Sequence, residues 1–558
     1  MSDLKKIKWV SCYKSRKDLH SFKENSLLFF ALDLRFGIDD FVELASNSLT
    51  DGGDDKKTDL IYIDSENGYV VIAQAYISKK WDKKEAPASK ASDLNTAASW
   101  ILNSPLDRLP QRIFTHAEEV RRCIKENIIK SIYFWYAHNL PESKNVDKEL
   151  KNVEETAKTL VAKNFPDARN VEICATEVGV ETLEKWYKTS QMPILVSDTF
   201  NIPISGGYKM KAADWESYIT AIPASWLYDK FKKYKGDIFS ANIRGYLGSR
   251  KRDENINNGI KKTGCDDPEH FWVFNNGITA LVNEFKENKN KGKLEIVIRG
   301  ISIVNGAQTT GALGSLEKSP AKNAYVPIRF VVCPKLETIQ NIVKYNNSQN
   351  KITAPDFRSS DSIQAYLSVQ FSELYNITYL SRRGGCEDII RRISNSISAI
   401  AAGQALAATH GFPEIAYNQK TYIWENDGLY SRFFNEKTTA QHILFVYSLL
   451  KAIEYKKLQL VRKSKAGKLT KIEENQLGFL RLRGAIILFC AAISQCLDIF
   501  IGSSIPNMFA LKFKAKKISL GKAIKIWAPI IDIGISFSDK LKDGLSDGLK
   551  NKDKIESA

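Results

Sequence analysis

Several patterns are missing from this sequence, and each absence excludes a class of protein. The eight cysteines (at 12, 123, 174, 265, 333, 386, 490 and 496) include no CxxC pair, and the six histidines are isolated. This spacing predicts no structural zinc site, and scattered thiols are typical of the reducing cytoplasm. Residues 1–20 contain no apolar signal core. We therefore expect a cytoplasmic protein.

Long hydrophobic runs and a common phosphate-binding motif are also lacking. The longest apolar stretch, residues 484–497, is too short to cross a bilayer and contains Ser494 and Gln495. It predicts a buried helix, and we expect no membrane contact. GxxxxGK[ST] does not occur, so a Walker-type ATPase has no support.

Positive charge is the most prominent feature that is present. The 558 residues include 81 Lys and Arg against 64 Asp and Glu, a net charge of +17. Residues 451–530 alone hold 16 Lys and Arg against 4 Asp and Glu. Such a surface indicates a nucleic-acid partner, DNA or RNA, because neutralising phosphates releases counterions. The alternative is a solubilising helical surface whose lysines extend from apolar flanks.

The apolar patterns predict an α/β multidomain protein with three domains. These are a compact α/β domain at 1–190, a mixed α/β core at 191–400 and a basic helical domain at 401–558. Period-two or fully apolar runs predict strands at 59–64, 69–78, 131–139, 171–178, 271–285, 294–310 and 326–332. Helical spacing predicts helices at 27–48, 90–103, 110–129, 181–188, 361–376, 389–409 and 437–454.

Two polar residues lie at equivalent levels of the first predicted hairpin. Asp59 begins one strand, and Gln74 follows fifteen residues later on the neighbouring strand. Adjacent strands are about 4.8 Å apart, so the hairpin would bring both side chains to one place. Metal-dependent phosphodiester cleavage needs carboxylates to hold Mg²⁺ and usually a lysine near the attacking water. The alternative interpretation is a plain β-hairpin with an Asp-rich turn.

The segments GGDDKKTDLIYID and VIAQAYISKK resemble the PD-(D/E)XK restriction-endonuclease-like fold, in the Mrr-like variant that ends in Gln-x-Lys. This resemblance implies Asp59 and Glu43 as Mg²⁺ ligands and Gln74 as a further catalytic residue. Tyr76 occupies the family's lysine position, and a phenol cannot supply that cation. Lys79 is the first candidate to replace it, with Lys80 and Lys90 as others. The domain would then be either a Mg²⁺-dependent nuclease or a degenerate module that only binds.

Amide-rich turns and arginines characterise the middle of the chain, in NIRGYLGSRKRDENINNGIKKT (242–263), FWVFNNGIT (271–279), ISIVNGAQTTGAL (301–313) and YNNSQNKITAPDFRSSD (345–361). Asn and Gln side chains and exposed backbone N–H groups in turns can bind anions. Arg side chains can bind a phosphate group through two parallel hydrogen bonds. The candidate nucleic-acid-binding residues are Arg244, Arg250, Arg252, Asn275, Asn276, Asn305, Gln308, Thr309, Asn347, Gln349, Arg382 and Arg383. The alternative is that Asn276-Gly277 and Asn305-Gly306 are ordinary turns.

The motifs FWVFNNGIT, IVNGAQTTGAL and YNNSQNKITAPDF resemble those of the abortive infection phage resistance (AIPR) proteins of bacteria, over roughly residues 200–400. The resemblance implies antiphage defence through a protein that binds, and in the enzymatic case cleaves, nucleic acid. A non-enzymatic sensor or scaffold, and a nucleotide-binding switch like ParB-type proteins, are the alternatives. The sequence leaves open a homo-oligomer and an operon-encoded partner. We expect the acidic hairpin and the Asn-rich turns to face one groove.

Overall fold

The chain forms two compact units in a computed structural model. The first contains residues 1–184 together with 353–558, and the second contains residues 185–352. The structure describes residues 8–38, 40–50, 54–168, 171–191, 194, 196–234, 238–239, 262–264, 266–290, 293–335, 338–339, 341–342, 358, 361–381, 395–515 and 517–558.

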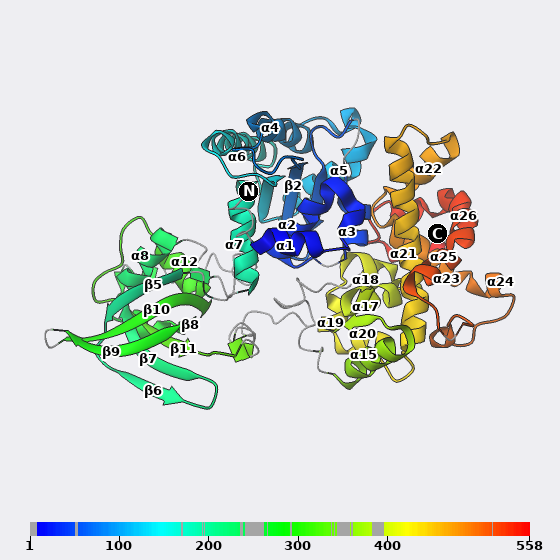
Figure 1. Cartoon of the computed structure of the whole chain (residues 1–558). Helices are drawn as coiled ribbons and strands as arrows, with labels where there is room; N and C mark the ends of the chain where they lie inside the picture. The colour runs from blue at the N-terminus through cyan, green and yellow to red at the C-terminus, as the bar shows by residue number, and fades with distance from the viewer. Residues whose placement is uncertain are drawn as a thin grey trace. The chain divides into compact units, whose positions relative to one another are not determined.

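The N-terminal part of the first unit is a mixed sheet with helices on both faces (Figure 1). The strands run in the order β1-β2-β3-β4, with β1 antiparallel to β2 and the later neighbours parallel. In chain order its elements are α1 (Lys8–Ser15), η2 (His20–Asn25), α2 (Ser26–Phe36), α3 (Phe41–Ser48), β1 (Leu60–Asp64), β2 (Tyr69–Tyr76), α4 (Ala88–Leu102), η3 (Leu106–Arg108), α5 (Gln111–Lys125), β3 (Ser131–His138), α6 (Lys144–Asn164), β4 (Glu172–Val178) and α7 (Val180–Gln191).

Strand alternation decides which helix covers which face of this sheet. Val70 and Ile72 on β2 belong to the buried cluster that includes α4, α5 and α6. The opposite face meets α2, where Phe36 stacks on Tyr69 with ring centroids 4.3 Å apart and on Trp135 at 5.6 Å. Successive side chains point to opposite faces of a strand, so Gln74 and Tyr76 share the face of Val70 and Ile72.

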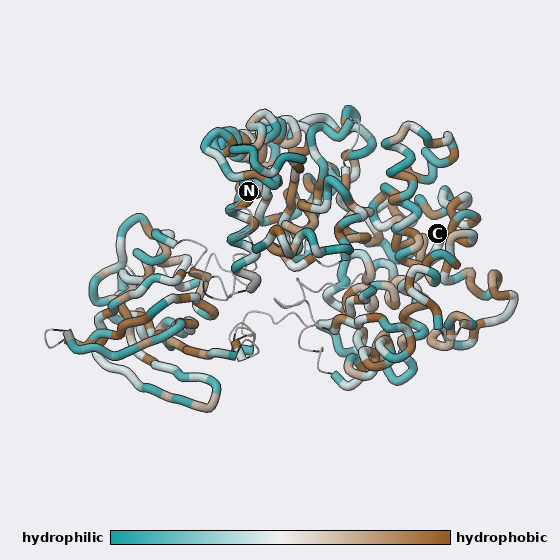
Figure 2. The backbone as a smooth tube through the Cα atoms, viewed as in Figure 1, coloured by the Kyte–Doolittle hydropathy of each residue, from teal (hydrophilic) through white to brown (hydrophobic). Residues whose placement is uncertain are grey.

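Helices make up nearly all of the C-terminal part of the first unit. Its elements are α15 (Ser362–Tyr375), β12 (Thr378–Leu380), β13 (Ser396–Ser398), α17 (Ala399–Thr409), α18 (Pro413–Asn418), α19 (Tyr422–Glu425), α20 (Asp427–Phe433), α21 (Ala440–Lys465), α22 (Lys471–Leu480), α23 (Ala485–Gln495), α24 (Leu497–Ile501), η6 (Met508–Ala510), α25 (Leu520–Ile526), α26 (Ala528–Gly534), η7 (Ile535–Leu541), η8 (Asp543–Leu545) and α27 (Lys552–Ser557). Helices α17, α21 and α23 supply much of its hydrophobic core. Figure 2 shows hydrophobic positions concentrated inside this helical part.

A buried ion cluster joins α3 to α21 within the first unit. Lys451 Nζ lies 2.5 Å from Asp40 Oδ2 and 2.8 Å from Glu454 Oε2, and its side chain is only 3% exposed. The pairing spans 411 residues of sequence. The N-terminal α/β part and the C-terminal helices therefore fold as one body.

The second unit is built on another mixed sheet, in the order β5-β10-β8-β11-β7-β6, with β9 paired to β10. Its elements are β5 (Val196–Pro203), β6 (Gly207–Lys211), β7 (Glu216–Pro223), α8 (Ala224–Tyr234), α11 (Phe271–Phe274), β8 (Ile278–Leu281), β9 (Glu284–Asn290), β10 (Lys293–Asn305), α12 (Ala307–Gly314) and β11 (Tyr325–Val332). Strands β8 and β11 are parallel, and β8 is antiparallel to β10.

These elements confirm the predicted α/β class and the helical C-terminal part, and residues 484–497 contain the expected buried helix, α23. Four predicted elements were wrong in part. Residues 396–398, inside the helix predicted over 389–409, form the strand β13, and residues 307–310, inside the strand predicted over 294–310, belong to α12. Residues 271–274 form the short helix α11, not a strand, and Phe271 alone among its residues is buried. The helix predicted over 27–48 is two helices, because Gly37 adopts a left-handed φ of 68° that ends α2. The division into three domains stays a prediction.

Candidate functional site

Asp59 and Gln74 lie side by side at the open end of the β1–β2 hairpin. The main-chain N–H of Asp59 donates to Ala73 O at 2.9 Å, which extends the register that pairs Leu60 with Ala73. The carboxylate Oδ2 of Asp59 accepts a hydrogen bond from the N–H of Ala75 at 2.7 Å. The predicted proximity of Asp59 to β2 is therefore present, and the carboxylate is held against the strand by this bond.

Gln74 has a buried amide with an unsatisfied oxygen. Its side chain is 4% exposed, and Oε1 has no hydrogen-bond partner among the described residues. The parallel register places Gln74 directly beside Tyr136 of β3, whose buried hydroxyl also lacks a partner there. Burial raises the pKa of Tyr136 well above its usual range, so the hydroxyl stays protonated. A buried polar atom without a partner costs roughly 1–3 kcal/mol, so two together point to a function.

A lysine that the sequence analysis did not single out lies near this end of β2. Lys79 is exposed in the loop after β2, where the preceding Ser78 forms a local turn with Lys80. Lys83 Nζ is 3.4 Å from the hydroxyl oxygen of Tyr76. Sequence spacing missed Lys83 because the loop after β2 folds back on the strand, and no local pattern signals that turn.

Glu43 is paired with a lysine from the C-terminal helical part. The residue lies in the first turn of α3, and its Oε1 is 3.3 Å from Lys420 Nζ. Glu43 raises the pKa of Lys420, so this lysine carries a full charge at every physiological pH. The two residues are 377 positions apart in sequence, so no local signal could have found the pair.

The side chains around Asp59 fit only part of a Mg²⁺ site. The Asp59 carboxylate and the orphaned Gln74 oxygen are hard oxygen donors of the type that Mg²⁺ binds. Glu43, the expected second carboxylate, is neutralised by Lys420. Across the described ranges, no group of three or more His, Cys, Asp and Glu side chains is placed to hold a metal ion. The described residues therefore do not complete such a site.

A buried histidine lies on the neighbouring strand, and the sequence analysis did not identify it. His138 Nε2 is 3.0 Å from Glu177 Oε1 of β4, and its Nδ1 accepts from Leu140 N at 3.3 Å. The register pairs His138 with Tyr76. Glu177 also accepts from the N–H of Ser143, the N-cap residue of α6. These bonds satisfy both ring nitrogens and fix the start of α6, so the pair supports the fold of this sheet edge.

In the second unit, the structure brings two of the Asn-rich motifs together. Asn275 Nδ2 lies 3.1 Å from Thr309 Oγ1, and Asn275 Oδ1 accepts from the N–H of Gly277 at 3.0 Å. Gly306, at φ 91°, begins α12, and a Cβ there would lie 2.6 Å from Ile278. The hydrogen bond between Asn275 and Thr309 therefore joins the segment before β8 to the start of α12, at the point where Gly306 packs closely against Ile278. Gln308 and Thr309 lie in the first turn of α12.

The remaining candidates of this set have varied surroundings. Asn276 is exposed, whereas Asn305 and Gln308 are partly buried. Asn276-Gly277 connects α11 to β8, so it is not a hairpin turn. The side chains of Trp272, Val273 and Phe274 are exposed directly before these turns. The other candidates, Arg244, Arg250, Arg252, Asn347, Gln349, Arg382 and Arg383, lie outside the described residues.

The acidic hairpin and the Asn-rich turns belong to different compact units. Asp59 and Gln74 lie in the first unit, and Asn275 and Thr309 lie in the second. A shared groove for the two motifs therefore stays a prediction.

The basic C-terminal segment presents a row of exposed lysines. Five of them lie within fourteen residues, at Lys512, Lys514, Lys517, Lys522 and Lys525. Buried Ile518, Ala523 and Trp527 anchor the segment, and Trp527 Nε1 donates to Ser448 Oγ of α21 at 2.9 Å. The sequence contains no Asp or Glu between Asp498 and Asp532. In the part of the chain that the structure describes, none of the five lysines forms an ion pair.

In the described ranges, no single helix combines the length and hydrophobicity needed to cross a membrane. The helices α22 and α23 meet the criterion only when taken together, and they are bent by 100° at the break between them.

Comparison with known proteins identifies the family. Neither the curated proteins nor the solved structures contain a match to this chain. The family model described as AIPR protein matches residues 239–524, just over half of the chain. The match includes the Asn-rich turns around Asn275 and Asn305 and the basic segment after Lys451. The chain therefore belongs to the AIPR protein family, which indicates a role in abortive-infection defence against phage.

Proposed function

We propose that this protein acts in abortive infection by binding nucleic acid through the exposed lysines of residues 512–525. The observation that carries the proposal is the row of five lysines that have no acidic partner among the described residues. Unpaired lysines at this density create a positive surface potential. A phosphate backbone would neutralise them and release condensed counterions.

The position of these lysines favours a backbone-binding surface over a merely solubilising one. Two exposed lysines of α6 are compensated, because Lys151 pairs with Asp147 and Lys158 pairs with Glu154. The 512–525 segment has no such acids, although it is anchored to α21 through Trp527. These lysines are therefore available to bind a polyanion, because no local salt bridge competes with phosphate for them.

The test is nucleic-acid binding by fluorescence anisotropy over a range of salt concentrations. The variant replaces Lys512, Lys514, Lys517, Lys522 and Lys525 with Gln. The matched control makes the same change at five exposed lysines of α6, at 144, 148, 151, 158 and 163. With duplex DNA, the first variant should lower the slope of log affinity against log salt by roughly 3–5, and the control by less than about 1. Equal slopes in both variants would refute the proposal.

We further propose that the N-terminal sheet is a restriction-endonuclease-like module that binds the nucleic acid. Asp59 beside Gln74 on an antiparallel hairpin supports this fold. The replacement of the family's lysine by Tyr76, and the pairing of Glu43 with Lys420, favour binding without cleavage.

Metal-dependent cleavage is the second candidate, and the position of Lys83 favours it. A cation 3.4 Å from the Tyr76 hydroxyl lies near the place where the family has its lysine. Purified protein is incubated with plasmid, single-stranded DNA and RNA in Mg²⁺ or Mn²⁺. Cleavage that is lost in Asp59→Asn and in Lys83→Met, but kept in Lys80→Met, would establish the enzyme. Retention without cleavage in all four proteins would establish the binding-only module.

A further inference from the structure

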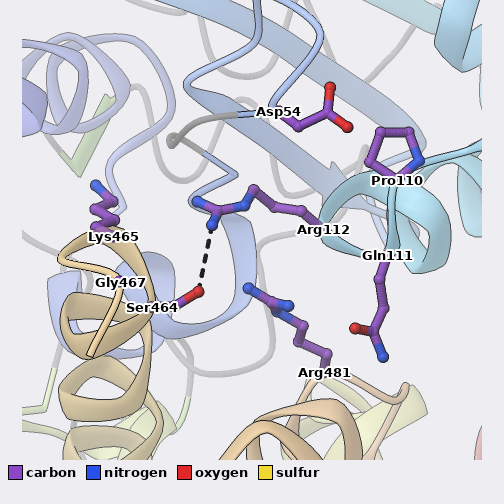
Figure 3. A pocket seen from close by; sticks show the side chains of 8 residues that line it. All are labelled: Asp54, Pro110, Gln111, Arg112, Ser464, Lys465, Gly467 and Arg481. Atoms are coloured by element: carbon purple, nitrogen blue, oxygen red, sulfur yellow. Dashed lines mark hydrogen bonds between the residues drawn. The ribbon is translucent and has the colours of Figure 1, made fainter. Parts of the chain in front are cut away.

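Two adjoining cavities lie inside the first unit, where α5 meets the ends of α21 and α22. The larger, of about 450 Å³, is lined by Asp54, Pro110, Gln111, Arg112, Ser464, Lys465, Gly467 and Arg481 (Figure 3). The smaller, of about 310 Å³, shares Arg112 and Arg481 with it and adds Lys457. Figure 3 shows the side chains of Arg112 and Arg481 both extending toward Ser464, to which Arg112 is hydrogen-bonded.

Two basic side chains at this junction, Lys457 and Arg481, have no neutralising partner among the described residues. Lys457 is only 8% exposed, and neither Lys457 nor Arg481 has an ion-pair or hydrogen-bond partner in the described ranges. Arg112 contacts the hydroxyl oxygen of Ser464 at 3.4 Å. A buried lysine without a partner is expensive, because burial removes the water that stabilises its charge.

The acids that line these cavities are already engaged elsewhere. Their partners are Lys451 for Asp40 and Glu454, Lys420 for Glu43, Arg122 and Arg483 for Glu119, Asn67 for Asp64, Thr421 for Glu66 and Lys56 for Asp54. The like charges at the junction instead act on each other. Burial, and then the charge of Arg481, lower the pKa of Lys457 to about 7. Burial, and then Arg112, lower the pKa of Arg481 to about 10.

The start of α5 adds a further attraction for an anion. This helix of 15 residues begins at Gln111, and its N-cap residue, Pro110, supplies no side-chain acceptor to the first turn. The first N–H groups of a helix and its dipole favour negative charge at this end. Pro110, Gln111 and Arg112 all line the larger cavity, so the helix end adds to the charge of the buried Lys457 and of Arg481.

We propose that this junction is a binding site for the phosphate group of a small phosphorylated ligand, held by Arg112, Arg481 and Lys457. Guanidinium groups bind tetrahedral oxyanions with paired hydrogen bonds, and a bound dianion would favour the protonated form of Lys457 as a third cation. Lys457 is only 8% exposed and lines the smaller cavity, which favours a small ligand over a polymer. The site is separate from the lysine row at 512–525, so it goes beyond the proposed nucleic-acid surface.

The test is isothermal titration calorimetry of the full chain at pH 7 with inorganic phosphate, sulfate, adenosine monophosphate and adenosine. We expect saturable binding of phosphate and adenosine monophosphate and none of adenosine. Arg481→Gln and Lys457→Met should each weaken phosphate binding at least about tenfold. The matched control, Arg462→Gln, changes an exposed arginine on α21 that lines neither cavity, and it should bind as the wild type does.

The unliganded variants provide a second measurement. Because Lys457 and Arg481 are uncompensated charges, Lys457→Met and Arg481→Gln should melt at or above the wild-type temperature while losing the upward shift that phosphate causes. Adenosine monophosphate binding more than tenfold tighter than phosphate would identify a nucleotide as the source, and equal affinities would identify free phosphate or any phosphomonoester. Unchanged phosphate binding in both variants, no saturation below about 10 mM phosphate, or equal losses of phosphate and single-stranded DNA binding would overturn the proposal.

Discussion

His410 and His442 contact each other through their ring nitrogens, with Nε2 atoms 2.8 Å apart. His442 Nδ1 lies 3.2 Å from the carbonyl oxygen of Leu511, so it carries the proton and donates to that oxygen. His410 then donates its Nε2 proton to His442. Burial, and then the charge of His442, lower the pKa of His410 to about 3, and burial lowers that of His442 to about 4.

This pair predicts a loss of stability on mild acidification. Both folded-state pKa values lie below the unfolded value near 6.5, so the unfolded chain binds more protons as pH falls. Stability that is present above pH 6.5 should be lost progressively between pH 6.5 and about 4, by about 1 kcal/mol for each histidine at pH 5.5. Urea unfolding at pH 7.5, 6.5 and 5.5 measures the effect. The double variant His410→Gln, His442→Gln should show a shallower pH dependence, and an identical one would contradict the prediction.

Replacing Lys451 with Met should destabilise the first unit strongly. The change leaves the buried carboxylates of Asp40 and Glu454 without their cation, which typically costs about 3–5 kcal/mol. Burial raises the pKa of Glu454 to about 8, so this carboxyl can take up a proton and the loss should be greater at pH 9 than at pH 6. Urea unfolding provides the measurement. Lys456→Met, which breaks only the surface pair with Asp532, should cost less than about 1 kcal/mol.

Gly306→Ala should disrupt the contact between the two Asn-rich motifs. The new Cβ would lie 2.6 Å from Ile278 Cγ1 and 3.1 Å from Gly277 O, at a backbone φ of 91° that side chains rarely adopt. We expect the melting temperature of the second unit to fall by several degrees. Gly521→Ala is the control, because nothing lies within 4 Å of its Cβ and the residue is helical. It should stabilise by about 0.5–1 kcal/mol, and a comparable loss in both variants would be a contradiction.

Gln74→Met should increase stability by about 1 kcal/mol, because it removes a buried oxygen that has no partner in the described ranges. The comparison is Gln404→Met, which removes a buried amide whose Nε2 donates to Ala416 O at 3.0 Å. That variant should lose about 1 kcal/mol. Stabilisation of the first variant together with loss of nucleic-acid retention would mean that Gln74 is maintained for binding. A destabilised Gln74→Met would mean that its amide serves the fold.

Local patterns were sufficient to predict the β1–β2 hairpin and the proximity of Asp59 to Gln74. Strand alternation and the turn sequence SENG at residues 65–68, between the two strands, are local patterns, so the sequence carries that information directly. The pattern of FWVF was ambiguous, because four apolar residues are consistent with a strand or a helical turn. Glu43, by contrast, was expected to serve a metal, and only long-range folding reveals that Lys420 neutralises it. Likewise, Lys83 contacts Tyr76 through a loop that no periodicity describes.

The ion pair between Asp40 and Lys451 has a consequence for how the protein is made. A ribosome adds roughly 5–20 residues each second, and 411 residues separate the two partners. Asp40 therefore emerges roughly 20–80 s before the lysine that neutralises it has been synthesised. During that interval Asp40 lacks its cation, so we expect the contact between α3 and α21 to form only after α21 has been synthesised.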